Sequence, residues 1–326
     1  MLTLKITRKN FSAKMVAGIL TAAISLPAAA VDNIHFLIPG GAGGGWDGTA
    51  RGTGEALNKS GLVATVSYEN MSGGGGGKAI GHLIESAEQN KETLMVNSTP
   101  IVIRSLSKVF PQSFRDLTPI AATIGDYGAF IVRNDSKYQS FEEVVADFNA
   151  DPRSIKIAGG SARGSMDHLV AAMAFQAAGG DPKAVRYVAY DAGGDAMAGL
   201  LSGETQLLST GFSEGLALQA AGEVRILVQT GDDRSDAAPD VPTLKELGYD
   251  ASFVNWRGFF AAPGISDAKK AEYLEAFEKM YDTSEWATVR DRNGWVEIYK
   301  PDAEFVSFLE QQEQVVGDLM RELGFL

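Results

Sequence analysis

Short apolar runs alternate with longer amphipathic segments along the first part of the chain. The apolar positions of Ile34–Ile38, Val63–Glu69 and Thr93–Val96 predict strands, and Trp46–Lys59 and Ala79–Glu88 between them predict helices. Alternation of strand and helix is typical of a parallel sheet that is covered by helices. The pattern therefore predicts an α/β fold.

The second half of the chain repeats this alternation. Strands are expected at Ser154–Ala158, Val185–Tyr190, Thr205–Ser209 and Arg225–Gln229, with helices that end at Gln176 and Leu201. Further helices are expected at Asp267–Tyr281, near Trp286 and at Ala303–Leu323. Two extended runs, Thr118–Arg133 and Phe253–Ala262, would connect the halves as ordered crossings. We expect two lobes around a cleft, with residues 31–125 plus 251–326 as lobe 1 and residues 126–250 inserted as lobe 2.

The first thirty residues have the pattern of a cleavable export signal. Four basic residues precede an apolar run from Met15 to Leu26, and Pro27 and three alanines follow. The apolar run is shorter than the roughly 20 residues that a membrane-spanning helix needs. We therefore predict residues 1–30 to be a signal peptide that is removed on export to the periplasm.

The charge and the composition exclude several classes of function. The formal charge of the whole chain is −12, and without residues 1–30, which hold four cations and no anions, it is −16. Nucleic-acid binding requires a basic face, so no nucleic-acid partner is expected. The chain has no cysteine, which excludes disulfides and thiolate chemistry. No metal site and no cofactor are predicted, because plausible metal ligands are few.

A glycine-rich loop follows the first predicted strand and opens the first predicted helix. It contains Gly41, Ala42, Gly43, Gly44 and Trp46. Glycines allow the backbone to approach a ligand closely, and the free N–H groups at a helix start attract an anion. Trp46 occupies the last glycine position of a dinucleotide fingerprint, and no nucleotide P-loop motif is present. The loop therefore favours a small anion over a nucleotide.

Four further segments occupy equivalent positions. Gly74 and Gly75 belong to a five-glycine run before the second helix, and Ser98 and Thr99 follow the third strand. The other candidate residues of these loops, all in the second half of the chain, are Ser161, Gly164, Ser165, Asp191 and Gly193. Ligands bind at the carboxyl ends of strands in open α/β sheets, and sites built from backbone donors suit carboxylates.

A serine hydrolase is the main alternative from another class. Ser161 or Ser165 would act with His168, one of three histidines in the chain. The sequence has neither the G-x-S-x-G elbow nor the H-E-x-x-H motif. We therefore predict a binding protein rather than an enzyme.

An ordered series of motifs gives the chain a family resemblance. The segments are Pro39–Asp47, the glycine run after Asn70, Gly125–Gly128, Ser161–Ser165, Tyr187–Gly194, Pro239–Thr243 and Trp256–Phe260. With them the chain resembles the substrate-binding proteins of tripartite tricarboxylate transporters. The resemblance implies a two-lobed type II periplasmic binding protein fold with a ligand cleft between the lobes.

The resemblance also implies a ligand and a site. Family members hold a carboxylate between the first glycine loop and the Ser/Gly loop of the second lobe, which nominates residues 41–44, Ser161, Gly164 and Ser165. The Asp126-Tyr127 pair and Arg257 resemble the branch that takes citrate-like ligands, and Arg257 would pair with an additional carboxylate. Arg163 departs from the family pattern and is either a second charged partner in the cleft or a solvated loop residue.

These implications predict a monomeric periplasmic receptor that captures a tricarboxylate such as citrate and delivers it to the membrane subunits of a transporter. A C4-dicarboxylate, an aromatic carboxylate or an amino acid is the alternative ligand. A sensor that binds the same ligand is the alternative role.

Overall fold

The computed structural model of the protein describes residues 31–326. The predicted signal peptide lies outside the described residues. Within residues 31–326, no helix combines the length and the hydropathy that are needed to cross a bilayer.

Ten strands are found in the described part of the chain, and the α/β prediction is confirmed. They are β1 (Val31–Ile38), β2 (Val63–Asn70), β3 (Thr93–Ser98), β4 (Thr118–Arg133), β5 (Lys156–Gly159), β6 (Arg186–Ala189), β7 (Leu207–Gly211), β8 (Val224–Gln229), β9 (Val254–Ala261) and β10 (Val296–Pro301). Their order is β2-β1-β3-β9-β4-β7-β5-β6, with β8 and β10 also paired to β4.

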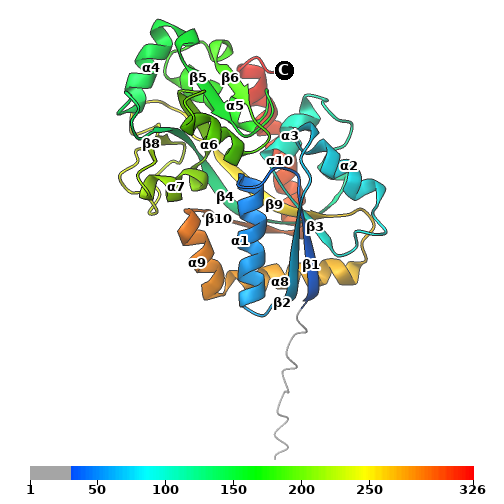
Figure 1. Ribbon diagram of the computed structural model, residues 1–326. Helices are drawn as coiled ribbons and strands as arrows, with labels where there is room; N and C mark the ends of the chain where they lie inside the picture. Colours follow the sequence, from blue (N-terminus) through cyan, green and yellow to red (C-terminus); the bar gives the residue numbers. More distant parts are fainter. Residues whose placement is uncertain (1–30) are drawn as a thin grey trace, which may run out of the picture.

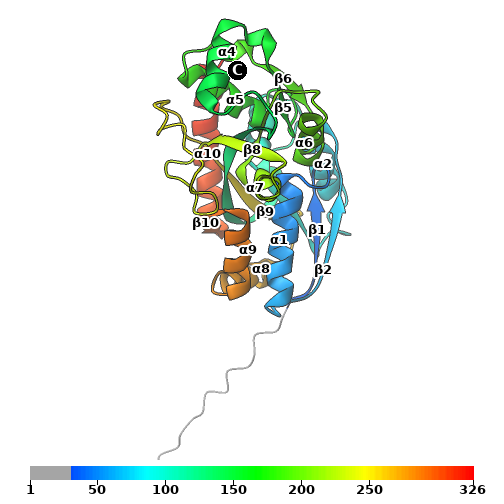
Figure 2. The same cartoon turned by 60° about the vertical axis from the view of Figure 1, so that its left-hand side comes forward.

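Ten α-helices cover these strands (Figure 1). They are α1 (Gly45–Lys59), α2 (Gly77–Glu85), α3 (Thr99–Leu106), α4 (Phe141–Ala150), α5 (Met166–Ala177), α6 (Gly193–Leu201), α7 (Phe212–Ala220), α8 (Asp267–Tyr281), α9 (Ser284–Asn293) and α10 (Asp302–Glu322). Helices α1 and α9 lie side by side in both views (Figures 1 and 2).

The first three strands are parallel, and β1 and β3 are largely buried on both faces, whereas the edge strand β2 is mostly exposed. Along β1, Phe36 and Ile38 belong to one hydrophobic cluster and Leu37 belongs to another. Along β3, Met95 joins the cluster of Leu37. Because successive side chains of a strand point to opposite faces, the apolar runs of β1 and β3 pack against helices on both sides of the sheet.

Strands β4 and β9 connect the two halves of the molecule (Figure 1). β4 pairs with β9 up to Tyr127, and from Gly128 onward it pairs with β7 and β8. The predicted crossings therefore form one antiparallel ladder. The division into residues 31–125 plus 251–326 and residues 126–250 stays a prediction, and this exchange of partners lies close to its first boundary.

Helix α10 runs from the half that contains β1–β3 to the half that contains β5–β7, where the chain ends (Figures 1 and 2). At that end the ring of Phe325 packs edge-on against His168 of α5, with ring centroids 4.9 Å apart. The C-terminal helix thus contacts both halves.

Four elements were not predicted from the sequence: α3, α4, α7 and β10. The predicted strands and helices otherwise occur with shifted ends, and Asp267–Tyr281 forms a helix with the expected bounds. Two of the missed helices, α3 and α7, supply side chains to the cavity described below.

Candidate functional site

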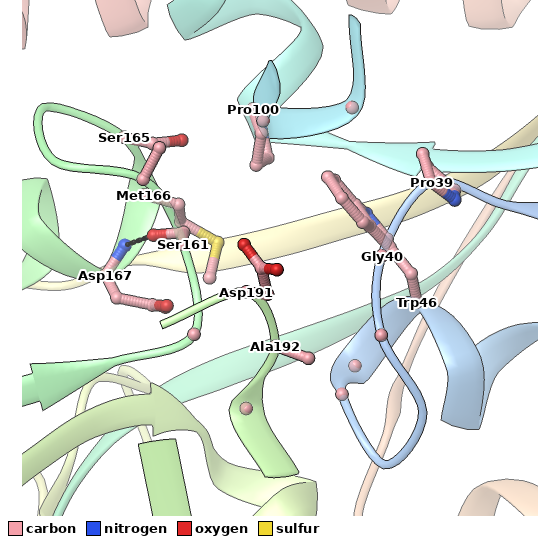
Figure 3. Close-up of a pocket in the computed structure, with 18 of the residues that line it drawn as sticks. Pro39, Gly40, Trp46, Pro100, Ser161, Ser165, Met166, Asp167, Asp191 and Ala192 are labelled. Atoms are coloured by element: carbon pink, nitrogen blue, oxygen red, sulfur yellow. Dashed lines mark hydrogen bonds between the residues drawn. The ribbon is translucent and has the colours of Figure 1, made fainter. Parts of the chain in front are cut away.

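A cavity of about 360 Å³ lies where the loops of the two halves face each other. Its wall from the first half consists of residues 39–41, 44–46, 72–76, 98, 100 and 104. Residues 160–163, 165–167, 189–193, 210 and 214 form the opposite wall, and Asn255 and Arg257 of β9 complete it. Figure 3 shows Pro39, Trp46 and Pro100 on one side, with Ser161, Ser165 and Met166 facing them.

Four helices begin at this cavity. The residues that precede α1, α3, α5 and α6 are Gly44, Ser98, Ser165 and Ala192, and all four line the cavity. None of them caps its helix through a side-chain hydrogen bond. Because the first N–H groups of a helix have no partner within the helix, they are available to a ligand, apart from the Thr99 N–H of α3 and the Asp167 N–H of α5, which donate to Asn255 Oδ1 and Ser161 Oγ.

Three helices that begin elsewhere contrast with these four. Ser140, Ser266 and Thr283 cap α4, α8 and α9 by accepting a hydrogen bond from a first-turn N–H. Side-chain capping is thus present at these three starts and absent at the four that face the cavity, although the start of α10 at Pro301 also lacks a side-chain cap. The arrangement favours an anionic ligand, which the helix dipoles also attract.

Asp47 holds the first glycine loop in shape. Its Oδ2 accepts a hydrogen bond from the Gly43 N–H at 3.1 Å, and its Oδ1 accepts from Asn70 Nδ2 at 3.1 Å. Trp46 donates from Nε1 to Ser98 Oγ at 2.9 Å, which links this loop to the end of β3. The loop is therefore ordered by side chains that lie beside the cavity.

The glycine loop also touches the loop of residues 191–194 from the other half. A Cβ placed on Gly41 would lie 3.0 Å from Ala192 Cβ, and one placed on Gly44 would lie 3.2 Å from the Gly193 nitrogen. On Gly194, a Cβ would lie 2.9 Å from the Ala42 carbonyl oxygen. The two halves approach closely here because these positions lack side chains.

Arg257 lies on β9 at the base of the cavity and is 2% exposed. Its Nη2 donates to Asp126 Oδ2 of β4 at 2.7 Å, and its Nη1 donates to Thr49 Oγ1 at 3.0 Å. Asp126 is also buried, so the protein already supplies one carboxylate to this guanidinium. Pairing of Arg257 with a ligand carboxylate stays a prediction.

Two buried carboxyl groups face the same part of the cavity. Burial raises the pKa of Asp167 to about 7 and that of Glu214 to about 8, although the nearby Arg257 charge acts in the opposite direction. Glu214 Oε2 has no hydrogen-bond partner among residues 31–326. At pH 7 Glu214 is therefore mostly protonated and Asp167 about half protonated, which reduces the negative charge that they add to the site.

Twelve of the seventeen predicted site residues line the cavity. They are Gly41, Gly44, Trp46, Gly74, Gly75, Ser98, Ser161, Arg163, Ser165, Asp191, Gly193 and Arg257. Their contact with a ligand stays a prediction. Arg163 is exposed at the cavity and donates from Nη2 to the Tyr187 carbonyl oxygen at 2.7 Å, and its pairing with a ligand charge stays a prediction.

The other five predicted residues do not line the cavity. Ala42 and Gly43 face the loop of residues 191–194, and Thr99, the first residue of α3, is fully buried. Tyr127 packs against Gly231, and the Gly164 N–H donates to His168 Nδ1 at 3.1 Å. These residues lie near the site without forming the wall of the cavity.

The cavity wall also includes residues that sequence reasoning missed. Chief among them are Arg104 of α3, Asp167 of α5 and Glu214 of α7. Arg104 and Glu214 lie on helices that the hydrophobic pattern did not predict. Asp167 lies two residues after the predicted Ser161–Ser165 segment, so its position near two serines was the available signal.

The geometry gives no support to the hydrolase alternative. His168 Nδ1 accepts from the Gly164 backbone, and the ring stacks on Tyr187 with centroids 4.7 Å apart. Burial lowers the pKa of His168 to about 4. Ser161 Oγ accepts from the Asp167 N–H at 3.0 Å, and within residues 31–326 neither serine hydrogen-bonds to His168. No Ser–His pair is therefore assembled.

Comparison with known proteins identifies relatives along most of the chain. A family model described as "Tripartite tricarboxylate transporter family receptor" matches residues 49–325. Protein BugT of Bordetella pertussis is 30% identical over 239 residues, which are 71% of this chain and 72% of that protein. A protein of Pseudomonas sp. (strain P51), described as "UPF0065 protein in tcbD-tcbE intergenic region", is 26% identical over 71% of this chain and 68% of its own length.

Solved structures share the fold. MatC from Rhodopseudomonas palustris with bound malate has a TM-score of 0.77 at 20% identity and covers 89% of this chain and 99% of its own. R. palustris Rpa4515 with adipate has a TM-score of 0.80 at 17% identity, over 90% and 97% of the two chains. The periplasmic binding protein BugD has a TM-score of 0.80 at 20% identity, over 90% and 98%. The prediction of a two-lobed periplasmic binding protein fold is confirmed.

Proposed function

The chain belongs to the tripartite tricarboxylate transporter receptor family, and on this premise we propose that it captures a small anion with two or three carboxylate groups for delivery to membrane transporter subunits. The observation that carries the proposal is the start of four helices without side-chain caps at one cavity. Citrate is the tricarboxylate that the sequence predicts, and dicarboxylates are the nearest alternative.

The size and the lining of the cavity agree with such a ligand. A volume of about 360 Å³ lies at the lower end of the range for small-molecule sites. Trp46, Pro39, Pro100 and Met166 offer apolar surface to a carbon skeleton, while backbone N–H groups and Ser161 offer hydrogen bonds to oxygen. Solved relatives of the same fold hold malate and adipate.

Capture would proceed by closure of the two halves. A carboxylate bound at the glycine loop of residues 40–45 would also contact the loops of residues 160–165 and 191–194 when the halves approach. Only the closed state satisfies both sets of donors, so a ligand shifts the population toward it. We expect the protein to act as a monomer in the periplasm, after cleavage of the signal predicted at residues 1–30.

A thermal-shift screen tests the proposal. Purified protein is heated with mono-, di- and tricarboxylates, aromatic acids and amino acids, with and without Mg²⁺. A ligand that binds only the native state raises the melting temperature by mass action. A shift with citrate supports the tricarboxylate prediction, and a shift with dicarboxylates alone keeps the receptor and replaces the ligand. The absence of any shift with carboxylates would contradict the proposal.

A further inference from the structure

Arg104 is a buried cation in the wall of the cavity. It lies in the last turn of α3 and is 8% exposed. The preceding residues Ile101, Val102 and Ile103 are at most 1% exposed, so the helix is otherwise embedded in apolar surroundings. A charged group is rarely kept in such a place without a partner.

The described protein supplies no counter-charge to this guanidinium. Arg104 Nε has no hydrogen-bond partner, and among residues 31–326 no neighbouring charge acts on the group. Burial alone lowers the pKa of Arg104. The other two arginines of the cavity differ, because Arg257 is paired with Asp126 and Arg163 is exposed and bonded to a carbonyl.

The glycine run is shaped around Arg104. Gly75 has a φ of +65°, a conformation that favours glycine. A Cβ at this position would lie 3.0 Å from Arg104 Nε and 3.3 Å from Cζ. The run therefore leaves room for a planar guanidinium beside the cavity.

We propose that Arg104 is a second carboxylate site, which makes the protein selective for ligands that carry two separated anionic groups. One carboxylate binds at the helix starts of the glycine and serine loops, and the other pairs with Arg104 beside Gly75. Arginine suits this role because its fork of N–H donors matches a carboxylate. The inference rests on the proposed function and deepens it by naming the ligand class.

Matched ligands and matched variants test the second site. Isothermal titration would compare butyrate with succinate and hexanoate with adipate, each pair differing in one carboxylate. The variants are Arg104→Gln, Arg104→Lys and, as a control with the same charge change on an exposed surface, Arg186→Gln. Citrate is measured in parallel.

Arg104→Gln should weaken the binding of the preferred dicarboxylate, or of citrate, by about 10- to 100-fold, the range expected for a charged hydrogen bond. The affinity for the matching monocarboxylate should change by less than about threefold. The dicarboxylate affinity of Arg104→Lys should lie between those of the wild type and Arg104→Gln, because lysine keeps the charge and loses the forked N–H donors of the guanidinium. Arg186→Gln should leave all affinities unchanged.

The melting temperature without ligand separates this role from a structural one. Because Arg104→Gln removes an unpaired buried charge, the melting temperature should stay the same or rise. Equal losses for mono- and dicarboxylates, or a wild type that binds both classes equally well, would overturn the second site while keeping the receptor. A wild type that binds no carboxylate would overturn the proposed function itself.

Discussion

Two glycines of α1 provide a matched test of the buried ion pair at the base of the cavity. A Cβ on Gly45 would lie 2.1 Å from Arg257 Nη2 and 2.6 Å from Cζ, whereas a Cβ on Gly48 would meet nothing within 4 Å. Gly45→Ala must therefore displace a guanidinium that bonds to Asp126, and Gly48→Ala adds a methyl group to open space. Both variants make the same chemical change in the same helix.

The expected effects on the free energy of unfolding have opposite signs. Gly48→Ala should stabilise by about 0.5–1 kcal/mol, because alanine is the better helix former. Breaking a buried ion pair costs about 3–5 kcal/mol, so Gly45→Ala should destabilise by about 2–5 kcal/mol even if its helix gains slightly. Urea unfolding followed by circular dichroism measures both values.

A third variant shows whether the cost comes from Arg257. In an Arg257→Met background the clash with the guanidinium is gone, so Gly45→Ala should cost at least 1 kcal/mol less than in the wild type. Equal effects of the two alanine variants, or the same cost of Gly45→Ala in both backgrounds, would refute the reasoning.

Three further predictions concern the cavity and its surroundings. Because burial raises the pKa of Asp167 to about 7 and of Glu214 to about 8, their contribution to stability is complete below about pH 4 and is lost as the pH rises through those values. The free energy of unfolding, relative to that of an Asp167→Asn/Glu214→Gln variant, should thus fall by at least about 1 kcal/mol per pH unit between pH 5 and 7, and a flat difference in urea titrations would contradict this. Gly194→Ala should weaken carboxylate binding at least about fivefold without lowering the melting temperature of the free protein, because the added methyl group meets the Ala42 carbonyl oxygen only when the two halves are close. Unchanged affinity in titration calorimetry would argue against closure of the halves at this contact. His168→Phe should keep carboxylate affinity within about threefold, since phenylalanine preserves the ring stacking, and a large loss would give this histidine a role in the site.

The hydrophobic pattern predicted the loops of the site because their signal is local. A strand, a glycine-rich turn and a helix follow one another within a few residues at 38–46 and again at 159–166. Parallel strands bring such turns to one edge, so the meeting of the two loops could be expected from the order of elements alone. The fold class followed from the same evidence.

Helix α3 escaped prediction for a physical reason. Its sequence is short, contains Pro100 near its start, and continues with three β-branched residues that are buried on all sides. With only eight residues the helix is shorter than the window over which a 3.6-residue period can be detected, and β-branched residues favour strands. Arg104 was therefore not recognised as part of the site.

The pairing of Arg257 with Asp126 could not be predicted either, because the two residues are 131 positions apart in sequence. Their contact depends on the register of β9 against β4, which places Arg257 opposite Ile124. From the sequence, Arg257 was a free cation available to a ligand. Within residues 31–326, Arg257 has Asp126 as its partner, whereas Arg104 is a buried guanidinium without a charged partner.

A crystal structure of the protein with the carboxylate that gives the largest thermal shift tests the central claim most directly. We expect the ligand to lie in the cavity between the two halves. One carboxylate should contact the N–H groups that begin α1, α5 or α6, and another should lie within about 3.2 Å of the Arg104 guanidinium. A ligand bound outside this cavity, or held without any contact to those helix starts, would contradict it.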